Sequence, residues 1–383
     1  MRRLITILAL WAAGLGAAAQ FGKISVLYGA FGAGYPGSSA VALGLIVSIV
    51  GIVGLIFGTT AGLLVARVGP RRGIVAALVM GAAMSLLQSQ GLPYGALIAS
   101  RVVEGVSHLA IVVIGPTVIA GLATERYRAL AMTLWSSFFG VTFALLALFA
   151  AAATVSGLFV AHAVWMAGVA VWLALLLPRD VVQPMAQGQG GLLAQHAAIY
   201  QSPSVAAPAM GFLCYTFLYV ALLTLLPPEV PLTHRVAAAV GMPMISIAVS
   251  LTFGVWLLGQ MAAWRLVQLG YGLAMPGFVV LLAFWGQGAV MAAASLWVAA
   301  ALGLIQGASF AAIPQLNPTA DSRARAAGAV AQMGNLGTTT GTPVLASVLV
   351  ATGPWGLTVV CLVACGLGIF LHQWQARRRE SLE

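Results

Sequence analysis

Residues 95–121 read GALIASRVVEGVSHLAIVVIGPTVIAG, and only Arg101 and Glu104 in this stretch are charged. As an α-helix it would be about 40 Å long, and the hydrocarbon core of a bilayer is about 30 Å thick. A helix of this length and composition is long enough to cross a membrane. Working outward in both directions, similar apolar runs follow one another along the whole chain, so we read residues 95–121 as one of many membrane spans.

The overall composition agrees with this interpretation. Of the 383 residues, 61% are hydrophobic and 6% are charged, whereas soluble domains carry about 25% charged residues. So few charges exclude a soluble enzyme, a disordered chain and a coiled coil, and three cysteines are too few for a disulfide scaffold. The net charge of +10 would suit nucleic acid, but the cations lie between apolar runs, so we expect a lipid bilayer and no nucleic acid as partner.

The apolar runs predict an all-α integral membrane protein with twelve transmembrane helices. They are too long and too uniformly apolar for the short alternating strands of an outer-membrane barrel. The predicted spans cover residues 4–30, 40–65, 73–91, 95–121, 130–153, 157–177, 205–226, 237–262, 270–287, 289–313, 327–350 and 354–373.

The distribution of arginines predicts the orientation, because cytoplasmic loops carry an excess of Lys and Arg. With the N-terminus inside, fourteen arginines fall in cytoplasmic segments and only Arg235 falls outside; Lys23 and Arg101 lie within spans. The fourteen are Arg2, Arg3, Arg67, Arg71, Arg72, Arg126, Arg128, Arg179, Arg265, Arg323, Arg325, Arg377, Arg378 and Arg379. We therefore expect both termini in the cytoplasm. Ala17–Ala19 before Gln20 also resembles a signal-peptide cleavage site, but cleavage would reverse this distribution.

A hydrophilic stretch near the middle predicts two halves. We expect an N-terminal six-helix bundle at residues 1–178, a flexible cytoplasmic linker at 179–204, and a C-terminal six-helix bundle at 205–383. An internal repeat supports this division, because Arg128 precedes Gly140 by 12 residues and Arg325 precedes Gly337 by 12. Tandem parallel halves related by a pseudo-two-fold axis are typical of transporters.

Two motifs resemble those of the major facilitator superfamily. The stretch GLLVARVGPRR at 62–72 resembles the family's loop signature between spans two and three, and RVVEG at 101–105 resembles its Arg-x-x-Gln-Gly element. The resemblance implies a gating loop that includes Gly62, Arg67, Gly69 and Arg71. Ala66 replaces the usual Asp, which puts the gating role in doubt, and the arginines also serve topology alone.

Charged residues inside the spans indicate a site, since each costs about 2.5–3.5 kcal/mol at mid-bilayer on insertion scales. Arg101, Glu104 and His108 share one helical face, and the resemblance implies that this face and Lys23 surround a central cavity. Three basic groups and one carboxylate suit an anionic substrate, and Glu104 or His108 could carry protons. Alternatively, Arg101 and Glu104 only brace the bundle, and His108 bonds a neighbouring backbone or Ser107.

Uncharged polar and aromatic groups complete the predicted substrate site, mostly in the C-terminal half. Besides Lys23, Arg101 and His108, the candidates are Gln20, Trp135, Tyr215, Tyr219, Gln306, Gln332 and Asn335. Helix–helix hydrogen bonding is an alternative for Gln332 and Asn335, and core packing for Trp135.

These observations favour a secondary active transporter of a small anionic or zwitterionic organic solute, working by alternating access, with proton-coupled uptake (symport) as a further expectation. We expect a monomer in a bacterial inner membrane. A multidrug-type exporter is the alternative; a copper importer is less favoured because no Cys/His cluster has ligand spacing. No phosphate loop, metal site or placed nucleophile indicates an enzyme or a cofactor.

The topology predicts the accessibility of introduced cysteines. In a cysteine-free background, Gln189→Cys and Ser381→Cys should react with an impermeant maleimide only from the cytoplasm, and Pro231→Cys only from outside. The reason is that an even number of predicted spans separates positions 189 and 381 from the cytoplasmic N-terminus, and an odd number separates position 231 from it. Labelling of position 189 from the periplasm would overturn the twelve-span arrangement.

Overall fold

The computed structural model describes residues 2–60, 68–150, 152–178 and 192–381, and every regular element in these ranges is a helix. The chain divides into two compact units. The first consists of Met1–Ser38 and Leu45–Gln187, and the second of Gly188–Glu383 with the short segment Ser39–Gly44. Each unit is built from apolar helices, as the composition predicts.

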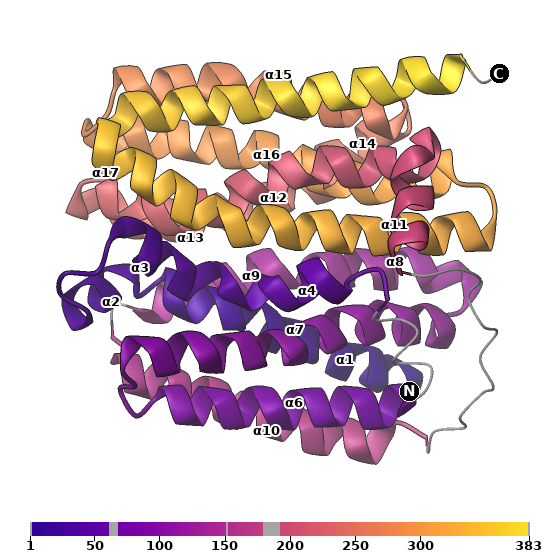
Figure 1. Ribbon diagram of the computed structural model, residues 1–383, viewed down its shortest axis with the longest axis horizontal. Helices are drawn as coiled ribbons and strands as arrows, with labels where there is room; N and C mark the ends of the chain where they lie inside the picture. Colours follow the sequence, from indigo (N-terminus) through magenta and orange to yellow (C-terminus); the bar gives the residue numbers. More distant parts are fainter. Residues whose placement is uncertain (1, 61–67, 151, 179–191, 382–383) are drawn as a thin grey trace. The chain divides into compact units, whose positions relative to one another are not determined.

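The helices of the first unit follow the predicted spans to within a few residues at most ends (Figure 1). They are α1 (Arg2–Ser25), α2 (Tyr28–Gly34), α3 (Ala40–Ser48), the 3₁₀-helix η1 (Ile49–Gly51), α4 (Ile52–Phe57), α6 (Pro70–Gln88), α7 (Tyr94–Leu122), α8 (Glu125–Ser136), α9 (Phe138–Ala150) and α10 (Val155–Leu176). The beginning of α3, up to Gly44, belongs to the second unit. The first predicted span, 4–30, ends early, because α1 stops at Ser25 and the glycine-rich α2 forms a separate helix. The break falls at Val26 and Leu27, which form a turn between the two helices.

The second unit begins with a helix that lies inside the predicted linker. Its elements are α11 (Leu192–Gln201), α12 (Pro203–Glu229), α13 (Leu232–Val249), the π-helix η2 (Ser250–Gly254), α14 (Val255–Leu258), α15 (Ala263–Ala283), α16 (Gly288–Leu316) and α17 (Ala320–Glu380). The linker predicted at 179–204 is therefore helical from Leu192 to Gln201, while its residues 179–191 lie outside the described part of the chain.

Helix α17 contains two of the predicted spans. It has 61 residues, which would make a straight helix about 90 Å long, three times the hydrocarbon thickness. At Gly353 the backbone leaves the helical region (φ 66°, ψ −159°), and Figure 1 shows the two parts of α17 running in opposite directions from this kink. Among the described residues, nine other candidate spans are each long and apolar enough to cross a membrane. With α8 and α9 counted as one bent span, the described helices accommodate the twelve predicted spans.

Small residues allow the helices of the second unit to pack closely. Gly334, Gly337 and Gly341 line the face of α17 that contacts α12, and a Cβ at Gly341 would collide with the backbone carbonyl of Phe217. Such close approach of backbones is typical of membrane helices, where small residues replace the hydrophobic effect as the source of tight packing.

Several of the arginines that predict the topology bond to the ends of helices. Arg71 donates to the carbonyl of Ala174 at 2.6 Å and Arg2 to that of Leu176 at 3.2 Å, both in the last turn of α10. Carbonyls in a last helical turn have no partner within the helix and carry partial negative charge. These cations therefore stabilise a helix end as well as marking a membrane face.

The kink at Gly353 predicts a sharp difference between two glycines of α17. Gly353→Ala should destabilise the protein by about 1–3 kcal/mol, because a side chain is strained in this backbone conformation. Gly366→Ala is the matched control, since its Cβ would meet no atom within 4 Å and Ala favours a helix over Gly by about 0.5–1 kcal/mol. Thermal unfolding in detergent should show a lower midpoint for the first variant only; equal midpoints would contradict the kink.

Candidate functional site

The polar site of the first unit starts from α7. Arg101 and Glu104 lie on its buried face, and both side chains are 0% exposed. The spacing i, i+3 puts them next to each other, and Arg101 Nη1 donates to Glu104 Oε2 at 2.5 Å. This is the bracing ion pair that the sequence left as an alternative, but Arg101 is only one of the donors to the carboxylate.

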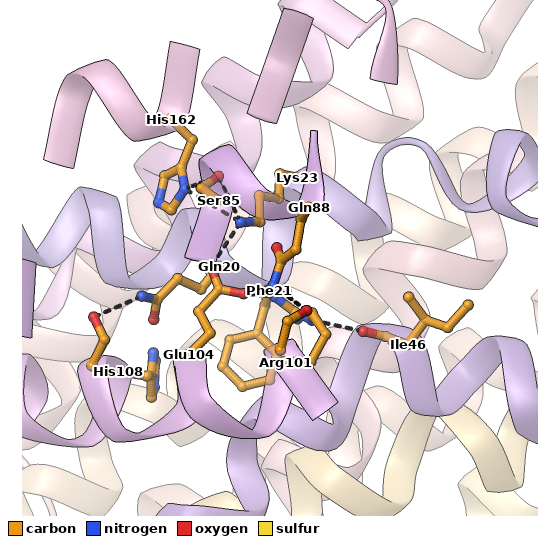
Figure 2. Close-up of polar contacts among 12 residues, drawn as sticks. Gln20, Phe21, Lys23, Ile46, Ser85, Gln88, Arg101, Glu104, His108 and His162 are labelled. Atoms are coloured by element: carbon orange, nitrogen blue, oxygen red, sulfur yellow. Dashed lines mark hydrogen bonds and ion pairs between the residues drawn. The ribbon is translucent and has the colours of Figure 1, made fainter. Parts of the chain in front are cut away.

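Glu104 accepts hydrogen bonds from three different helices (Figure 2). Its Oε1 accepts from Lys23 Nζ of α1 at 2.7 Å, and its Oε2 also accepts from Gln88 Nε2 of α6 at 3.1 Å. Hydrogen bonds that involve an ionised group are roughly twice as strong as neutral ones. The carboxylate therefore links α1, α6 and α7 at one point inside the unit.

Lys23 is held on every side by polar groups. Besides Glu104, its amine lies 3.0 Å from Ser85 Oγ and 3.3 Å from His162 Nδ1 of α10, and it lies 4.5 Å from the centre of the Phe159 ring. An ammonium group has three protons, and here each has an acceptor. A fully buried lysine is thus completely satisfied by α6, α7 and α10.

The remaining donors of Arg101 reach a change of helix type. Arg101 Nε donates to the carbonyl of Ile46 at 3.0 Å and Nη2 to that of Val47 at 2.9 Å, immediately before α3 gives way to η1. A change from α to 3₁₀ geometry disturbs the usual pairing of carbonyls and often marks a hinge. A Cβ at Gly105 would collide with the carbonyl of Val50 in η1. Glycine at position 105 therefore allows α7 to pack closely against η1.

Four of these residues were not predicted from the sequence. His162, Ser85, Gln88 and Phe159 all contact the ion cluster, yet none was among the candidates. A histidine in the middle of the apolar run 157–177, and the pair Ser85 and Gln88 at i, i+3 in the run 73–91, were available signals.

The cluster carries a net positive charge in its ordinary protonation state. Two cations, Lys23 and Arg101, surround one carboxylate, Glu104, and all three are fully buried. Removing one partner from a buried ion pair costs about 3–5 kcal/mol, because the remaining charge is left without compensation. The cluster is thus held together by its one anion, with one positive charge in excess.

The structure places Gln20 and His108 close by but outside the ion cluster. Gln20 Nε2 donates to Ser107 Oγ at 3.0 Å, and no described residue bonds its buried Oε1. His108 Nδ1 lies 3.1 Å from the carbonyl of Ala17, and its ring stands edge-on to Phe21. A ring nitrogen beside a carbonyl must donate, so His108 has the backbone partner that the sequence gave as the alternative to a proton-carrying role.

The candidates of the second unit include a stack of aromatic rings on α12. Phe212, Tyr215 and Tyr219 follow at i, i+3 and i+7, with ring centres 5.2 and 5.1 Å apart. Both tyrosine side chains are almost fully buried, and within the described residues the hydroxyl of Tyr215 has no hydrogen-bond partner. A buried hydroxyl without a partner is costly.

The other candidates of this unit mostly bond within the protein. Gln332 on α17 accepts from Tyr200 Oη at 2.8 Å and lies 2.9 Å from His196 Nε2, both on α11. Burial raises the pKa of Tyr200 to about 12, so its hydroxyl stays protonated and donates. Asn335 donates to the carbonyl of Ala331 at 2.8 Å, and Gln306 is half-buried. Gln332 therefore links α11 to α17, and Asn335 bonds a backbone carbonyl of its own helix.

Trp135 belongs to the apolar core of the first unit. It is 7% exposed, its ring lies 4.9 Å from that of Phe138, and it fills the space beside Gly115, where a Cβ would collide with it. These contacts agree with core packing, the alternative given for this residue.

Two members of the predicted gating loop are described and two are not. Gly62 and Arg67 lie outside the described residues. Gly69 has φ 89° and precedes Pro70 at the first position of α6, so this turn requires glycine. Arg71 bonds the end of α10, as shown above. Among the described residues no group of three His, Cys, Asp or Glu side chains could hold a metal ion.

An all-helical membrane fold of two units, with buried charges inside the spans, defines a polytopic transport protein. The family model of the Major Facilitator Superfamily matches residues 6–342, and the chain belongs to this family. It is an integral, multi-pass membrane transporter. No curated protein sequence matches the chain significantly.

Solved structures share the fold over nearly the whole chain. The human organic anion transporter MFSD10 (TETRAN) is 16% identical with a TM-score of 0.73, covering 97% of this chain and 99% of that one. A bacterial homologue of the human lysosomal transporter Spinster, inward-facing and unoccupied, is 16% identical with a TM-score of 0.71 and 98% coverage of both. The transporter FucP in the outward conformation is 15% identical with a TM-score of 0.69, covering 98% and 99%.

The charge balance of the cluster predicts an order of stability among variants. Glu104→Gln leaves Lys23 and Arg101 facing each other without an anion and should cost about 3–5 kcal/mol. Lys23→Met leaves the Arg101–Glu104 pair intact and electrically neutral, so it should cost less. Melting curves of the purified protein in detergent measure both. A Lys23→Met variant as unstable as Glu104→Gln would show that the amine, and not the carboxylate, holds the cluster.

Proposed function

We propose that this transporter moves a small organic anion or zwitterion across a bacterial inner membrane by alternating access, with uptake coupled to protons. The observation that carries the proposal is the excess positive charge of the Lys23–Glu104–Arg101 cluster. A buried net charge is costly inside a bilayer, and an arriving carboxylate or phosphate would neutralise it.

Binding of an anion to this cluster would be an exchange of partners. Both cations already bond to Glu104, so a substrate anion gains their hydrogen bonds only as Glu104 gives them up. Arg101 can hold a carboxylate with two parallel bonds, whereas Lys23 acts as a point charge. Substrate recognition would therefore loosen the polar contacts that fasten α1 and α7, which supports a link between binding and conformational change.

The polar candidates of the second unit would serve the uncharged part of the substrate. The stacked rings of Tyr215 and Tyr219, and the hydroxyl of Tyr215 without a partner in the described chain, suit an aromatic or hydroxylated group. The same stack favours the second candidate function, efflux of apolar drug-like compounds. Uptake of lipophilic dyes and of small organic acids distinguishes the two.

Orientation and assembly complete the proposal. The distribution of arginines places both termini in the cytoplasm, and we take the monomer as the working unit. Symport follows from the need to balance the charge of an entering anion with a proton.

Reconstitution into proteoliposomes tests this function directly. A panel of labelled organic acids and matched neutral analogues, assayed with and without an inward-directed pH gradient, should show accumulation of an anion only with the gradient. Arg101→Ala should weaken binding of that anion about 10- to 150-fold, as expected for loss of a charged hydrogen bond worth about 1.5–3 kcal/mol. The variant should fold, because Lys23 and Glu104 remain a neutral pair.

Two results would contradict the proposal. Accumulation of neutral analogues in preference to anions would remove the anionic substrate, and normal anion binding by a well-folded Arg101→Ala variant would remove Arg101 from recognition. Extrusion of lipophilic dyes, with no uptake of acids, would favour the efflux function.

A further inference from the structure

Two basic side chains in the core of the first unit are in direct contact. Lys23 Nζ lies 3.3 Å from His162 Nδ1, and neither side chain is more than 6% exposed. Two neighbouring bases in a buried site hold a proton between them more readily than one proton each, because two adjacent positive charges repel strongly where water is excluded.

The hydrogen-bond partners of His162 define where its proton lies. Its Nε2 is 3.0 Å from the carbonyl of Gly16, and a carbonyl only accepts, so Nε2 carries the hydrogen. Its Nδ1 faces the amine of Lys23, which only donates, and Ser85 Oγ at 2.9 Å. Ser85 can donate to the carbonyl of Phe159, 2.9 Å away. His162 is therefore a neutral imidazole whose unprotonated Nδ1 accepts from Lys23.

Glu104, by contrast, is held in its ionised form by its donors. Its two oxygens accept from Lys23, Arg101 and Gln88, and hydrogen bonds from two cations and an amide favour the charged carboxylate over the neutral acid. The charged groups that face the Lys23–His162 pair are thus Glu104 and, behind it, Arg101, both from α7. Besides Lys23 itself, the described hydrogen-bond partners of His162 are the carbonyl of Gly16 on α1 and the hydroxyl of Ser85 on α6, neither of which is charged.

We propose that the proton exchanged during transport is held by the Lys23–His162 pair, while Glu104 stays ionised. The step is a transfer within the pair: an Nζ–H bond breaks, an Nδ1–H bond forms, Lys23 becomes a neutral amine and His162 becomes an imidazolium. The charge of the pair is unchanged by this step, and water supplies or removes the proton that completes a cycle. The inference rests on the proton-coupled transport proposed above and names its carrier.

The transfer has a structural consequence within the unit. With the proton on His162, the positive charge has moved from beside Glu104 on α7 to α10, and the bond between Lys23 and Glu104 changes from an ion pair to a weaker neutral–ion contact. Arg101 is then the only cation bonded to Glu104. Proton position would in this way control how firmly α1 is fastened to α7.

His162→Gln tests the pair with little change in shape. The glutamine oxygen can accept from Lys23 as Nδ1 does, but an amide cannot take up a proton. In proteoliposomes the variant should lose accumulation driven by a pH gradient and retain counterflow exchange of the substrate. His234→Gln is the matched control, because His234 lies at the start of α13 and contacts Thr233; it should behave as wild type in both assays.

The possible outcomes separate this inference from the proposed function. If wild type shows counterflow but no pH-driven accumulation, proton coupling itself fails, and the carrier with it. If wild type accumulates substrate and a folded His162→Gln variant does so equally well, only the assignment of the carrier is wrong and Glu104 becomes the next candidate.

A spectroscopic measurement tests the pair without transport activity. In protein labelled with ¹⁵N in the histidine rings, with His162 assigned by replacing the other four histidines in turn, the wild type at neutral pH should show one protonated nitrogen, Nε2, and one bare nitrogen, Nδ1. An Nδ1–H tautomer, or a ring protonated at both nitrogens under these conditions, would overturn the proposal even if His162→Gln failed to fold.

Discussion

Inside a bilayer a charged side chain must find its counter-charge within the protein, and in the first unit this requirement falls on Glu104. Among the described residues its carboxylate is the only anion in contact with Lys23 and Arg101, and through them and Gln88 it joins α1, α6 and α7. His162 extends the same network to α10 by way of Lys23. Four helices therefore share one set of polar contacts, and the loss of one side chain in this set alters the contacts of several helices.

The two units meet the demands of the membrane in different ways. The first has charged groups at its centre, while in the described part of the second the helices are joined by glycine-lined faces, stacked rings and uncharged hydrogen bonds such as those of Gln332. A hydrogen-bonded or charged group can exchange one partner for another, whereas closely packed backbones have no alternative partner. This difference favours the first unit as the one that responds to charge.

Much of the fold could be predicted from the sequence, because each apolar run must be about as long as the bilayer is thick. The run at 95–121 became α7 almost residue for residue, and Arg101 and Glu104 share a face because their spacing requires it. The direction of the Lys23 side chain could not be predicted, since a flexible four-carbon chain reaches several neighbours. The roles of His162 and Gln332 depend on helices brought together by tertiary packing, α10 onto α1 and α11 onto α17, which periodicity does not reveal.

The three donors bonded to Glu104 constrain every account of how this protein works. Hydrogen bonds from two cations and an amide favour the charged form of the carboxylate, so an exchangeable proton is better sought on a neutral base such as His162. The same bonds mean that an anion would reach Lys23 or Arg101 by competing with Glu104. Proton and substrate would then act on one set of hydrogen bonds from opposite sides, the proton by weakening the hold of Lys23 and the anion by replacing the carboxylate. Coupling between the two needs no long-range pathway, because both act on the same three side chains.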